Sequence, residues 1–334
     1  MRTRLCSLLF VLALAVLVLP GTAAARDTVC RLAYMAKVQY APQLLALQHG
    51  WFRAQGMEVQ GINLGMTTGI SATEALVSGS ADVAVMGDVP GLIALASAHP
   101  TVLVCAYGGG ENMHALIVSD KSGIRSADDL KGKRIGCHFG SSTHGGLHLF
   151  LARHNLASSV TLVNTPQKNL VEALLSGSIE AFAASEPAPS LALAKIPGAR
   201  LLTTLSGLGN SYPLVMVASR AYAEAHPEVL RLLVEGTKRG VDFILADPAR
   251  AAQEVSRLTG APAAMEEKTL KTLEWRVRLD DEVLTSLQRT AEFLHGIQRL
   301  KRVPNLPSLV WQDPEVTQDA SAQGRAEDWK KEAD

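Results

Sequence analysis

The chain has 334 residues, and its 32 lysines and arginines balance its 32 aspartates and glutamates. Because proteins that bind nucleic acid carry a basic surplus, this balance argues against nucleic acid as a partner. The length is sufficient for a large apolar core and is typical of a chain that divides into two lobes.

Residues 1–25 have the pattern of a secretory leader. Two arginines precede an apolar stretch at residues 8–19, and the small residues Ala23 and Ala25 follow it. The stretch is short for a membrane span, whereas small residues at these positions suit signal peptidase. We therefore expect cleavage near Ala25, export to the periplasm and a soluble mature chain.

The cysteines do not form a complete disulfide framework. Cys6 lies in the leader, and the other three, Cys30, Cys105 and Cys137, lie in or beside apolar runs. Three is an odd number, so the remaining thiols cannot all pair within one chain. We expect them to be buried as small apolar side chains.

From Val29 onward, short β-branched runs alternate with helical patterns, and the same rhythm restarts at His114. This alternation predicts βαβ units and mainly parallel sheets, which is the α/β class. Residues 227–300 are predicted to be almost wholly helical, with residues 266–279 as a surface helix. From Val303 the chain turns polar and then charged, which indicates a strap followed by a frayed tail.

An internal repeat organises this pattern. Residues 74–88 and 172–186 align at a spacing of 98 residues and share Glu, Ala, Leu, Ser, Gly and Ser within the first seven positions. In each copy a predicted helix is followed by a strand that ends in an acid, Asp88 or Glu186. Ligands of open α/β sheets bind beyond the carboxyl ends of strands, so we expect both acids near one cleft between two lobes.

A polar cluster separates a predicted strand from a predicted helix and consists of Gly140, Ser141, Ser142, Thr143 and His144. Helix amino ends have unpaired N–H groups and a partial positive charge. The glycine lets a ligand approach the backbone, and the hydroxyls add donors, so the cluster suits an oxyanion. Ordinary helix capping by Ser141 or Ser142 is the alternative.

The histidines of this stretch allow a second interpretation. His144 and His148 are four residues apart on the predicted helix and His138 is nearby, which is the spacing of a metal-binding pair. Zinc needs a third and usually a fourth ligand, and no residue is obviously placed to supply them. We therefore expect neither a metal site nor a cofactor, and keep exported-metal binding as a minor alternative.

Four segments carry a family resemblance: "PQLLALQHGWFRAQGMEV", "EALVSGSADVAVMGDVP", "SGIRSADDLKGKRIGCHFGSSTH" and "EALLSGSIEAFAASEP". Together they resemble the SsuA/THI5-like substrate-binding proteins of nitrate, sulfonate and taurine ABC importers, over roughly residues 29–300. The resemblance implies a type II periplasmic-binding-protein fold, in which two α/β lobes close over a small molecule. It also implies a two-subunit permease and its ATPase as partners, with the binding protein itself a monomer.

The resemblance implies the division of the chain. Lobe 1 would comprise residues 26–113 and 214–302, lobe 2 residues 114–213, and the strap and tail residues 303–334. The crossovers between the lobes would lie near residues 112–118 and 209–216.

The family's cleft positions would fall on a set of polar and aromatic residues. They are Gln39, Tyr40, Thr67, Thr68, Asp88, Ser141, Ser142, Thr143, His144, Glu186 and Tyr212.

The chemistry of these positions favours a particular kind of solute. The hydroxyls and the helix end suit a sulfonate, sulfate-like or carboxylate head, whereas Asp88 and Glu186 would repel a second negative group. A small anion or zwitterion such as an aliphatic sulfonate or taurine therefore fits best. An aminopyrimidine precursor of thiamine, nitrate and bicarbonate are the alternatives.

An enzyme is the rival from a different class. Pyrimidine synthases of thiamine biosynthesis resemble these binding proteins in fold but carry a cysteine-rich motif, and no two cysteines of this chain are close in sequence. The sequence also has no nucleophile elbow, phosphate loop or dinucleotide fingerprint. We therefore expect a binding protein and not an enzyme.

Overall fold

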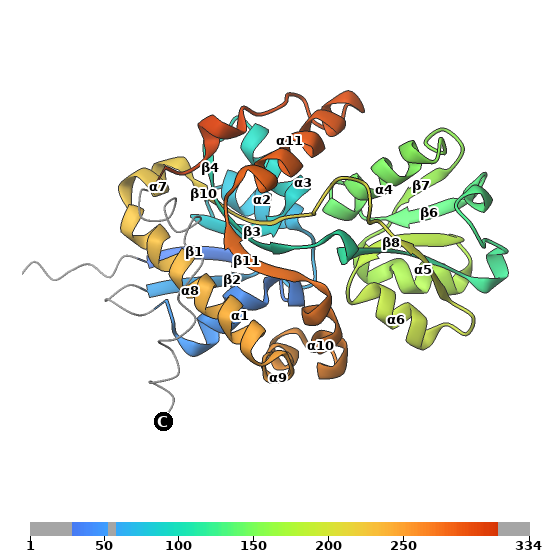
Figure 1. The fold of residues 1–334 in the computed structure, drawn as a ribbon, viewed down its shortest axis with the longest axis horizontal. Coiled ribbons are helices and arrows are strands. Elements are labelled where there is room, and N and C mark those ends of the chain that lie inside the picture. The colour runs from blue at the N-terminus through green and yellow to red at the C-terminus, as the bar shows by residue number, and fades with distance from the viewer. Residues whose placement is uncertain (1–28, 53–57, 313–334) are drawn as a thin grey trace, which may run out of the picture.

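The computed structural model describes residues 29–52 and 58–312. The expected leader and the charged end of the expected tail lie outside the described residues. Two sheets flanked by helices form two lobes, joined by two extended segments (Figure 1). Within the part of the chain described here, no helix is both long enough and apolar enough to cross a membrane.

The sheet of lobe 1 has the strand order β11-β4-β10-β3-β1-β2. Its strands are β1 (Val29–Tyr34), β2 (Glu58–Asn63), β3 (Val83–Gly87), β4 (Thr101–Gly109), β10 (Leu214–Ser219) and β11 (Glu274–Arg278). The central strand β3 is an apolar run buried at every residue, as expected for a strand covered on both faces. Strands β1, β2 and β3 are parallel, and β10 is antiparallel to β3 and β4.

The sheet of lobe 2 has the strand order β7-β6-β8-β5-β9. Its strands are β5 (His114–Val118), β6 (Arg134–Cys137), β7 (Thr161–Asn164), β8 (Ala181–Ser185) and β9 (Arg200–Thr204). Apart from the added edge strand β11, this order repeats that of lobe 1, with β8 in the place of β3 and β5 in the place of β10. The two lobes are therefore built on one plan, as the internal repeat predicted.

Helices cover both faces of each sheet. Lobe 1 carries α1 (Ala41–His49), α2 (Gly69–Val77), α3 (Asp88–Ala96), α7 (Arg220–Ala225), α8 (Pro227–Ala246), α9 (Pro248–Thr259), α10 (Ala263–Thr272) and α11 (Asp281–Gly296). Lobe 2 carries α4 (Ser142–Arg153), α5 (Leu170–Ser176) and α6 (Ala188–Lys195). The lobes are in close contact, because a β-carbon at Gly145 of α4 would lie 2.7 Å from Val89 Cγ2 of α3.

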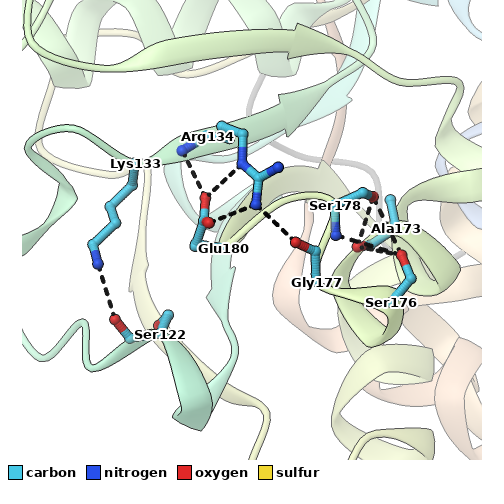
Figure 2. A network of polar contacts seen from close by, with 8 residues as sticks. All are labelled: Ser122, Lys133, Arg134, Ala173, Ser176, Gly177, Ser178 and Glu180. Carbon is cyan, nitrogen blue, oxygen red and sulfur yellow. Dashed lines mark hydrogen bonds and ion pairs between the residues drawn. The ribbon is translucent and has the colours of Figure 1, made fainter.

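The repeat extends to its polar contacts. In lobe 1 the Arg31 guanidinium donates to both oxygens of Asp82, at 3.0 and 2.6 Å. In lobe 2 the Arg134 guanidinium donates to both oxygens of Glu180, at 3.2 and 2.7 Å (Figure 2). Asp82 and Glu180 occupy the same position of the repeat, so β1 and β6 are tied to the segments before the buried strands β3 and β8 in the same way.

Strand β11 corrects the prediction that residues 266–279 form one surface helix. The helix α10 ends at Thr272, and the chain continues as a strand paired with β4. Trp275 is buried whereas its neighbours Glu274 and Arg276 are exposed, which is the period of a strand. The Trp275 indole N–H donates to the Leu270 carbonyl at 2.8 Å, so the tryptophan fixes the turn from helix to strand.

The chain passes between the lobes twice, at residues 110–113 and 205–213, just before β5 and β10 begin. The passages adjoin, because the Gly110 N–H donates to the Ser211 carbonyl at 2.8 Å. The described part of the expected strap lies along lobe 1. There the Trp311 N–H donates to the Leu103 carbonyl of β4 at 2.8 Å, and the Trp311 side chain is buried.

Candidate functional site

A small cavity of about 40 Å³ lies between the lobes, and a wider groove of about 430 Å³ adjoins it. Thr68 and Gln167 line both spaces, so the groove and the cavity are neighbours. The cavity can hold a small polar head group, and the groove can hold a longer substituent.

Three helices begin at the cavity. Thr68 and Gly69 at the start of α2, Gly87 before α3, and Ser141 and Ser142 at the start of α4 all line it. The first N–H groups of a helix have no partner within the helix, and the aligned peptide dipoles make this end partially positive. Helix ends from both lobes therefore favour an anion in the cavity.

Lys37 adds a full positive charge at the same place. It follows β1, lines the cavity and is only 5% exposed. Its Nζ donates to Gln167 Oε1 of lobe 2 at 2.5 Å. Among residues 29–52 and 58–312 no carboxylate pairs with it, and burial lowers the pKa of Lys37 to about 8. A buried ammonium without a counter-charge is costly, and a bound anion would offset that cost.

His114, the first residue of β5, also lines the cavity. Its Nδ1 lies 2.9 Å from Thr143 Oγ1, and its Nε2 is buried without a hydrogen-bond partner in the described structure. Burial, together with the charge of Lys37, lowers the pKa of His114 to about 3, so the ring is neutral at physiological pH. The unpaired ring nitrogen is available to a bound solute.

Tyr212 packs against His114. Its ring is buried and meets the His114 ring edge to face, with centroids 4.6 Å apart. Its hydroxyl donates to the Leu205 carbonyl at 2.7 Å, so the tyrosine is fixed within the second crossover. Tyr212 therefore supports the cavity wall and does not itself line the cavity.

Gln39 joins the lobes across the cavity. Its Nε2 donates to the Glu186 carbonyl of lobe 2 at 3.3 Å, which orients the amide. Its Oε1 is then buried without a donor in the described structure. A solute that carries an N–H or O–H group could supply that donor.

Six of the twelve residues expected at the site line the cavity, and Thr67 lines the adjoining groove. The six are Gln39, Tyr40, Thr68, Ser141, Ser142 and Thr143. The other expected residues, Asp88, Gly140, His144, Glu186 and Tyr212, lie around the cavity with their polar groups bonded to the protein.

Ser141 is the N-cap of α4, as the alternative interpretation predicted. Its Oγ accepts from the His144 N–H at 3.2 Å and donates to the His138 carbonyl at 2.7 Å. Capping and cavity lining therefore coexist at this residue, because the cap leaves the N–H groups of Ser142 and Thr143 at the helix end.

Asp88 is fully buried, and its carboxylate is held by the protein. It accepts from Asn210 Nδ2 at 3.0 Å, from the Val89 N–H at 2.8 Å and from the Ser142 hydroxyl. Burial raises the pKa of Asp88, and these hydrogen bonds oppose the rise. The carboxylate thus links α3 to the second crossover and to α4, and is not among the groups that line the cavity.

Glu186 likewise bonds within the protein. Its carboxylate accepts from the Ser190 N–H at 3.1 Å and from the Ser190 hydroxyl at 2.8 Å, at the start of α6. Only its backbone carbonyl faces Gln39. We expected Asp88 and Glu186 to repel a second negative group on the solute. Neither carboxylate lines the cavity, so this expected repulsion has no source there.

His144 is buried beside the cavity. Its Nδ1 accepts from the Gly140 N–H at 3.2 Å, its Nε2 lies 3.0 Å from His148 Nε2, and its ring stacks on Phe139. Burial lowers the pKa of His144 to about 3. Across the described ranges, no group of three histidine, cysteine or acidic side chains is placed to hold a metal ion.

Sequence reasoning missed Lys37, His114 and Gln167. Lys37 follows β1 at its carboxyl end, two residues before Gln39, so its position in the pattern already pointed to the cleft. Gln167 follows β7 in the same way. His114 is the first residue of β5 in lobe 2, and no local sequence pattern predicts that it lines the cavity. The three cysteines Cys30, Cys105 and Cys137 are free and buried, as expected.

Comparisons with known proteins agree with this geometry. The sequence profile of the family described as NMT1/THI5 like matches residues 37–251. The taurine-binding periplasmic protein of Escherichia coli (strain K12) is 28% identical over 205 residues, covering 58% of this chain and 62% of that protein. The alkanesulfonate-binding protein SsuA from Xanthomonas axonopodis pv. citri, solved bound to MOPS, is 26% identical, with a TM-score of 0.77 over 87% of this chain and 100% of that one.

One further relative is named as an enzyme. The 4-amino-5-hydroxymethyl-2-methylpyrimidine phosphate synthase of Aspergillus parasiticus is 24% identical over 229 residues, covering 64% of this chain and 66% of that protein. The family profile itself spans most of both lobes and includes Lys37, the polar start of α4 and the duplicated segments. With its two-lobed periplasmic-binding-protein fold, this chain belongs to the NMT1/THI5-like family.

Proposed function

We propose that the chain is the solute-binding component of an ABC importer and captures a small organic anion, an aliphatic sulfonate or a taurine-like zwitterion. The protein would be exported to the periplasm as a monomer, with residues 1–25 removed. It would deliver the solute to a membrane permease that is driven by a cytoplasmic ATPase.

The observation that carries this proposal is the buried ammonium of Lys37. It lies in a cavity at which α2, α3 and α4 begin, with the hydroxyls of Ser142 and Thr143 in the same wall. Its own hydrogen-bond partner is the neutral amide oxygen of Gln167. A sulfonate head would accept from the ammonium and from the helix N–H groups at once, which gives the buried ammonium the counter-charge that it lacks.

The adjoining groove supports a solute with a substituent. A head group in the cavity of about 40 Å³ leaves the groove of about 430 Å³ for an alkyl or amino-alkyl chain. The relative from Xanthomonas axonopodis pv. citri was solved with MOPS, which is itself a substituted alkanesulfonate.

We further propose that closure of two lobes captures the solute. Lobe 1 would comprise residues 26–113 and 214–302 and lobe 2 residues 114–213. Hydrogen bonds join them at the cavity, from Lys37 to Gln167, from Gln39 to the Glu186 carbonyl and from the Ser142 hydroxyl to Asp88. Opening would break these bonds and turn about the two crossovers, and a bound anion would favour the closed state.

Isothermal titration calorimetry tests the assignment directly. The panel is taurine, ethanesulfonate, butanesulfonate, MOPS, nitrate, bicarbonate and an aminopyrimidine. We expect saturable binding of at least one sulfonate, with nitrate and bicarbonate weaker because they leave the groove empty. If no sulfonate binds while the folded protein is intact, the proposal is wrong.

The buried Oε1 of Gln39 favours a second candidate, an aminopyrimidine, because its amino group could donate to that oxygen. A neutral ring would leave Lys37 without a counter-charge, whereas taurine supplies both an ammonium donor and an anion. We therefore place the aminopyrimidine second. Stronger binding of the aminopyrimidine than of every sulfonate would reverse the order.

We also propose that the chain is a binding protein without catalytic activity. Because one relative is named as a synthase, catalytic activity is the competing assignment. Conversion of a bound aminopyrimidine to a new product, followed by mass spectrometry, would overturn the proposal.

A further inference from the structure

A second cavity, of about 290 Å³, lies beside the two crossovers, and we call it the hinge pocket. It is lined by Gly110 of the first crossover and by Ser211 and Pro213 of the second, together with parts of β4, β11 and α11. Met113, at the end of the first crossover, and Leu214, just after the second, line the cavity between the lobes instead. The crossovers therefore contribute to the walls of two spaces that have no lining residue in common.

Strand β11 supplies charged side chains to the hinge pocket. Glu274 and Arg276 both line it and alternate with the buried Trp275, so they share one face of the strand. The Glu274 side chain lies over the first crossover, because a β-carbon at Gly110 would be 3.8 Å from Glu274 Cγ. Among residues 29–52 and 58–312, neither Glu274 nor Arg276 forms an ion pair or a side-chain hydrogen bond.

The charges at the start of α11 are already engaged by the protein. The Arg278 guanidinium donates to both carboxylate oxygens of Glu282, at 2.7 and 3.0 Å. These bonds and, to a smaller extent, the nearby charge of Arg276 lower the pKa of Glu282, which shows that the Arg276 side chain is directed toward the start of α11. The hinge pocket thus presents one carboxylate near the first crossover and one guanidinium near α11, each without a protein partner in the described ranges.

The backbone that forms the wall of the hinge pocket is the part of the fold that lobe movement would bend. Gly109 and Gly110 have φ values of 154° and 125°, which glycine adopts far more readily than other residues. Tyr212, between the lining residues Ser211 and Pro213, has a φ of 46°, which is uncommon for a residue with a β-carbon. Backbone strain of this kind collects at switch regions, and opening of the lobes would change the shape of the pocket.

A chain of buried hydrogen bonds joins the hinge pocket to the cavity. The Ser211 N–H donates to Ser286 Oγ at 3.2 Å, and the Ser286 hydroxyl donates to Asn210 Oδ1 at 3.2 Å. Asn210 Nδ2 donates to Asp88 at 3.0 Å, and Asp88 also accepts from the hydroxyl of Ser142, which lines the cavity. Because Ser142 belongs to lobe 2 and Asp88 to lobe 1, the chain ends at a contact that exists only while the lobes are together.

We propose that the hinge pocket is a second binding site, which takes a small zwitterion of the α-amino acid class and favours the closed arrangement of the lobes. The ammonium of the ligand would pair with Glu274 and its carboxylate with Arg276, and an aliphatic side chain would lie against Pro213 and Val283. The pocket is present together with the hydrogen bonds that join the lobes, so a ligand that fits it raises the affinity for solute. The pocket stands apart from the proposed function, whereas its coupling to sulfonate affinity rests on it.

Calorimetry with L-leucine tests the site without any sulfonate. We expect saturable binding to the wild type and to Lys37→Met, because Lys37 lines the other space. Arg276→Gln and Glu274→Gln should each weaken L-leucine binding about tenfold or more, since each removes one charge partner. Arg257→Gln and Glu58→Gln, which replace exposed residues elsewhere in lobe 1, are the matched controls and should bind L-leucine as the wild type does.

Two analogues of L-leucine test the class of ligand. N-acetyl-L-leucine lacks the ammonium, and L-leucinamide lacks the carboxylate. We expect each to bind the wild type about tenfold more weakly than L-leucine, because a zwitterion uses Glu274 and Arg276 together. Binding of either analogue as tight as that of L-leucine would overturn the assignment of a zwitterion.

The coupling is measured with the tightest-binding sulfonate of the calorimetry panel. Saturating L-leucine should lower the dissociation constant of the sulfonate about fivefold, and saturating sulfonate should do the same for L-leucine, because coupling between two sites is reciprocal. Arg276→Gln should bind sulfonate with no response to L-leucine. Ser286→Ala interrupts the hydrogen-bond chain, so it should bind both ligands with a coupling below about twofold.

The outcomes separate the hinge pocket from the proposed function. L-leucine binding that is lost in Lys37→Met, or that neither Arg276→Gln nor Glu274→Gln weakens, would overturn the hinge pocket. Sulfonate binding without any L-leucine binding would also overturn it and leave the proposed function intact. L-leucine binding that depends on Arg276, with no binding of any sulfonate, would support the pocket and overturn the solute assignment. A sulfonate affinity that bound L-leucine leaves unchanged would overturn the coupling.

Discussion

Lys37 and Gln167 are 130 residues apart in the chain, yet Lys37 Nζ lies 2.5 Å from Gln167 Oε1 across the cavity. This hydrogen bond places a buried positive charge between two lobes and satisfies it only with a neutral oxygen. The arrangement costs stability when the cavity is without an anion and offsets that cost when an anion is bound.

Replacing Lys37 with methionine should therefore weaken sulfonate binding without lowering the free energy of unfolding. We expect Lys37→Met to weaken sulfonate binding about 100-fold or more, because it removes the charge that faces the head group. The free energy of unfolding without solute should stay the same or rise by up to about 3 kcal/mol, since a buried pKa moved from 10.5 to about 8 reflects that order of cost. Calorimetry and urea unfolding measure the two effects.

Lys168→Met is the matched control for this variant. Lys168 is exposed and lines the groove instead of the cavity. Its removal should change the dissociation constant by no more than about threefold, as expected for an exposed charge. Equal losses from Lys37→Met and Lys168→Met would contradict a special role for the buried ammonium.

The pH dependence of binding should report the same lysine. In the free protein the pKa of Lys37 is about 8, and an anion favours its charged form, so binding takes up a proton above that pH. Sulfonate affinity should be flat below pH 8 and fall about tenfold per pH unit above it, until the pKa of the complex is reached. Titrations in two buffers of different ionisation enthalpy detect the proton, and Lys37→Met should show no uptake.

Stability and sulfonate affinity should change with pH in opposite directions. Because the folded-state pKa of Lys37 is depressed below the unfolded value of 10.5, the unfolded chain binds more protons between pH 8 and 10.5. The contribution of Lys37 to the free energy of unfolding therefore rises with pH across this window. Cysteines and tyrosines titrate there in the unfolded chain, whereas burial raises their pKa above this window in the folded protein. The difference between the wild type and Lys37→Met therefore isolates the lysine.

The sequence predicted the duplicated framework because the repeat reflects constraints that are local to each lobe. The helix, glycine turn and buried strand recur in order, and the Arg31 to Asp82 contact recurs as Arg134 to Glu180. Strand β11 escaped prediction because Trp275 and Val277 offer only two alternating positions within a helical region. Its position as an edge strand depends on pairing with β4, which is far away in sequence.

The part of the site that is formed by a local sequence motif could also be predicted. The polar start of α4 is a local motif, and Ser142 and Thr143 line the cavity as expected. The polar contacts of Asp88 and Lys37 are set by other segments. Asp88 bonds to Asn210, and Lys37 to Gln167, and each pairing spans more than 100 residues. A lysine in a loop is ordinarily exposed, so only the approach of the two lobes makes it a buried charge.

Asp88 should act as a structural link and not as a solute contact. Asp88→Ala leaves Asn210 Nδ2 and the Ser142 hydroxyl without their acceptor, and we expect a loss of about 1–3 kcal/mol in the free energy of unfolding. Affinities for taurine and for ethanesulfonate should change by the same factor, because the carboxylate does not face the cavity. A selective loss of taurine binding would show instead that Asp88 contacts the ammonium group.

Gly140 should control closure through Ile70. Gly140 of lobe 2 has a φ of 78°, and a β-carbon there would overlap Ile70 Cδ1 of lobe 1. Gly140→Ala should therefore lower stability by about 1–2 kcal/mol through the left-handed backbone, and should also weaken taurine binding, by up to about tenfold, because the Ile70 side chain must shift before the lobes can meet.

The two effects are separable by a double variant and a control. Ile70→Ala in the Gly140→Ala background removes the overlap, so taurine affinity should recover while the loss of stability remains. Gly123→Ala has the same backbone strain, with a φ of 70°, but a β-carbon there has no neighbour within 4 Å. It should therefore lower stability without changing affinity. If affinity does not recover in the double variant, the Gly140 to Ile70 contact is not part of the solute-bound state, and closure must bring the lobes together elsewhere.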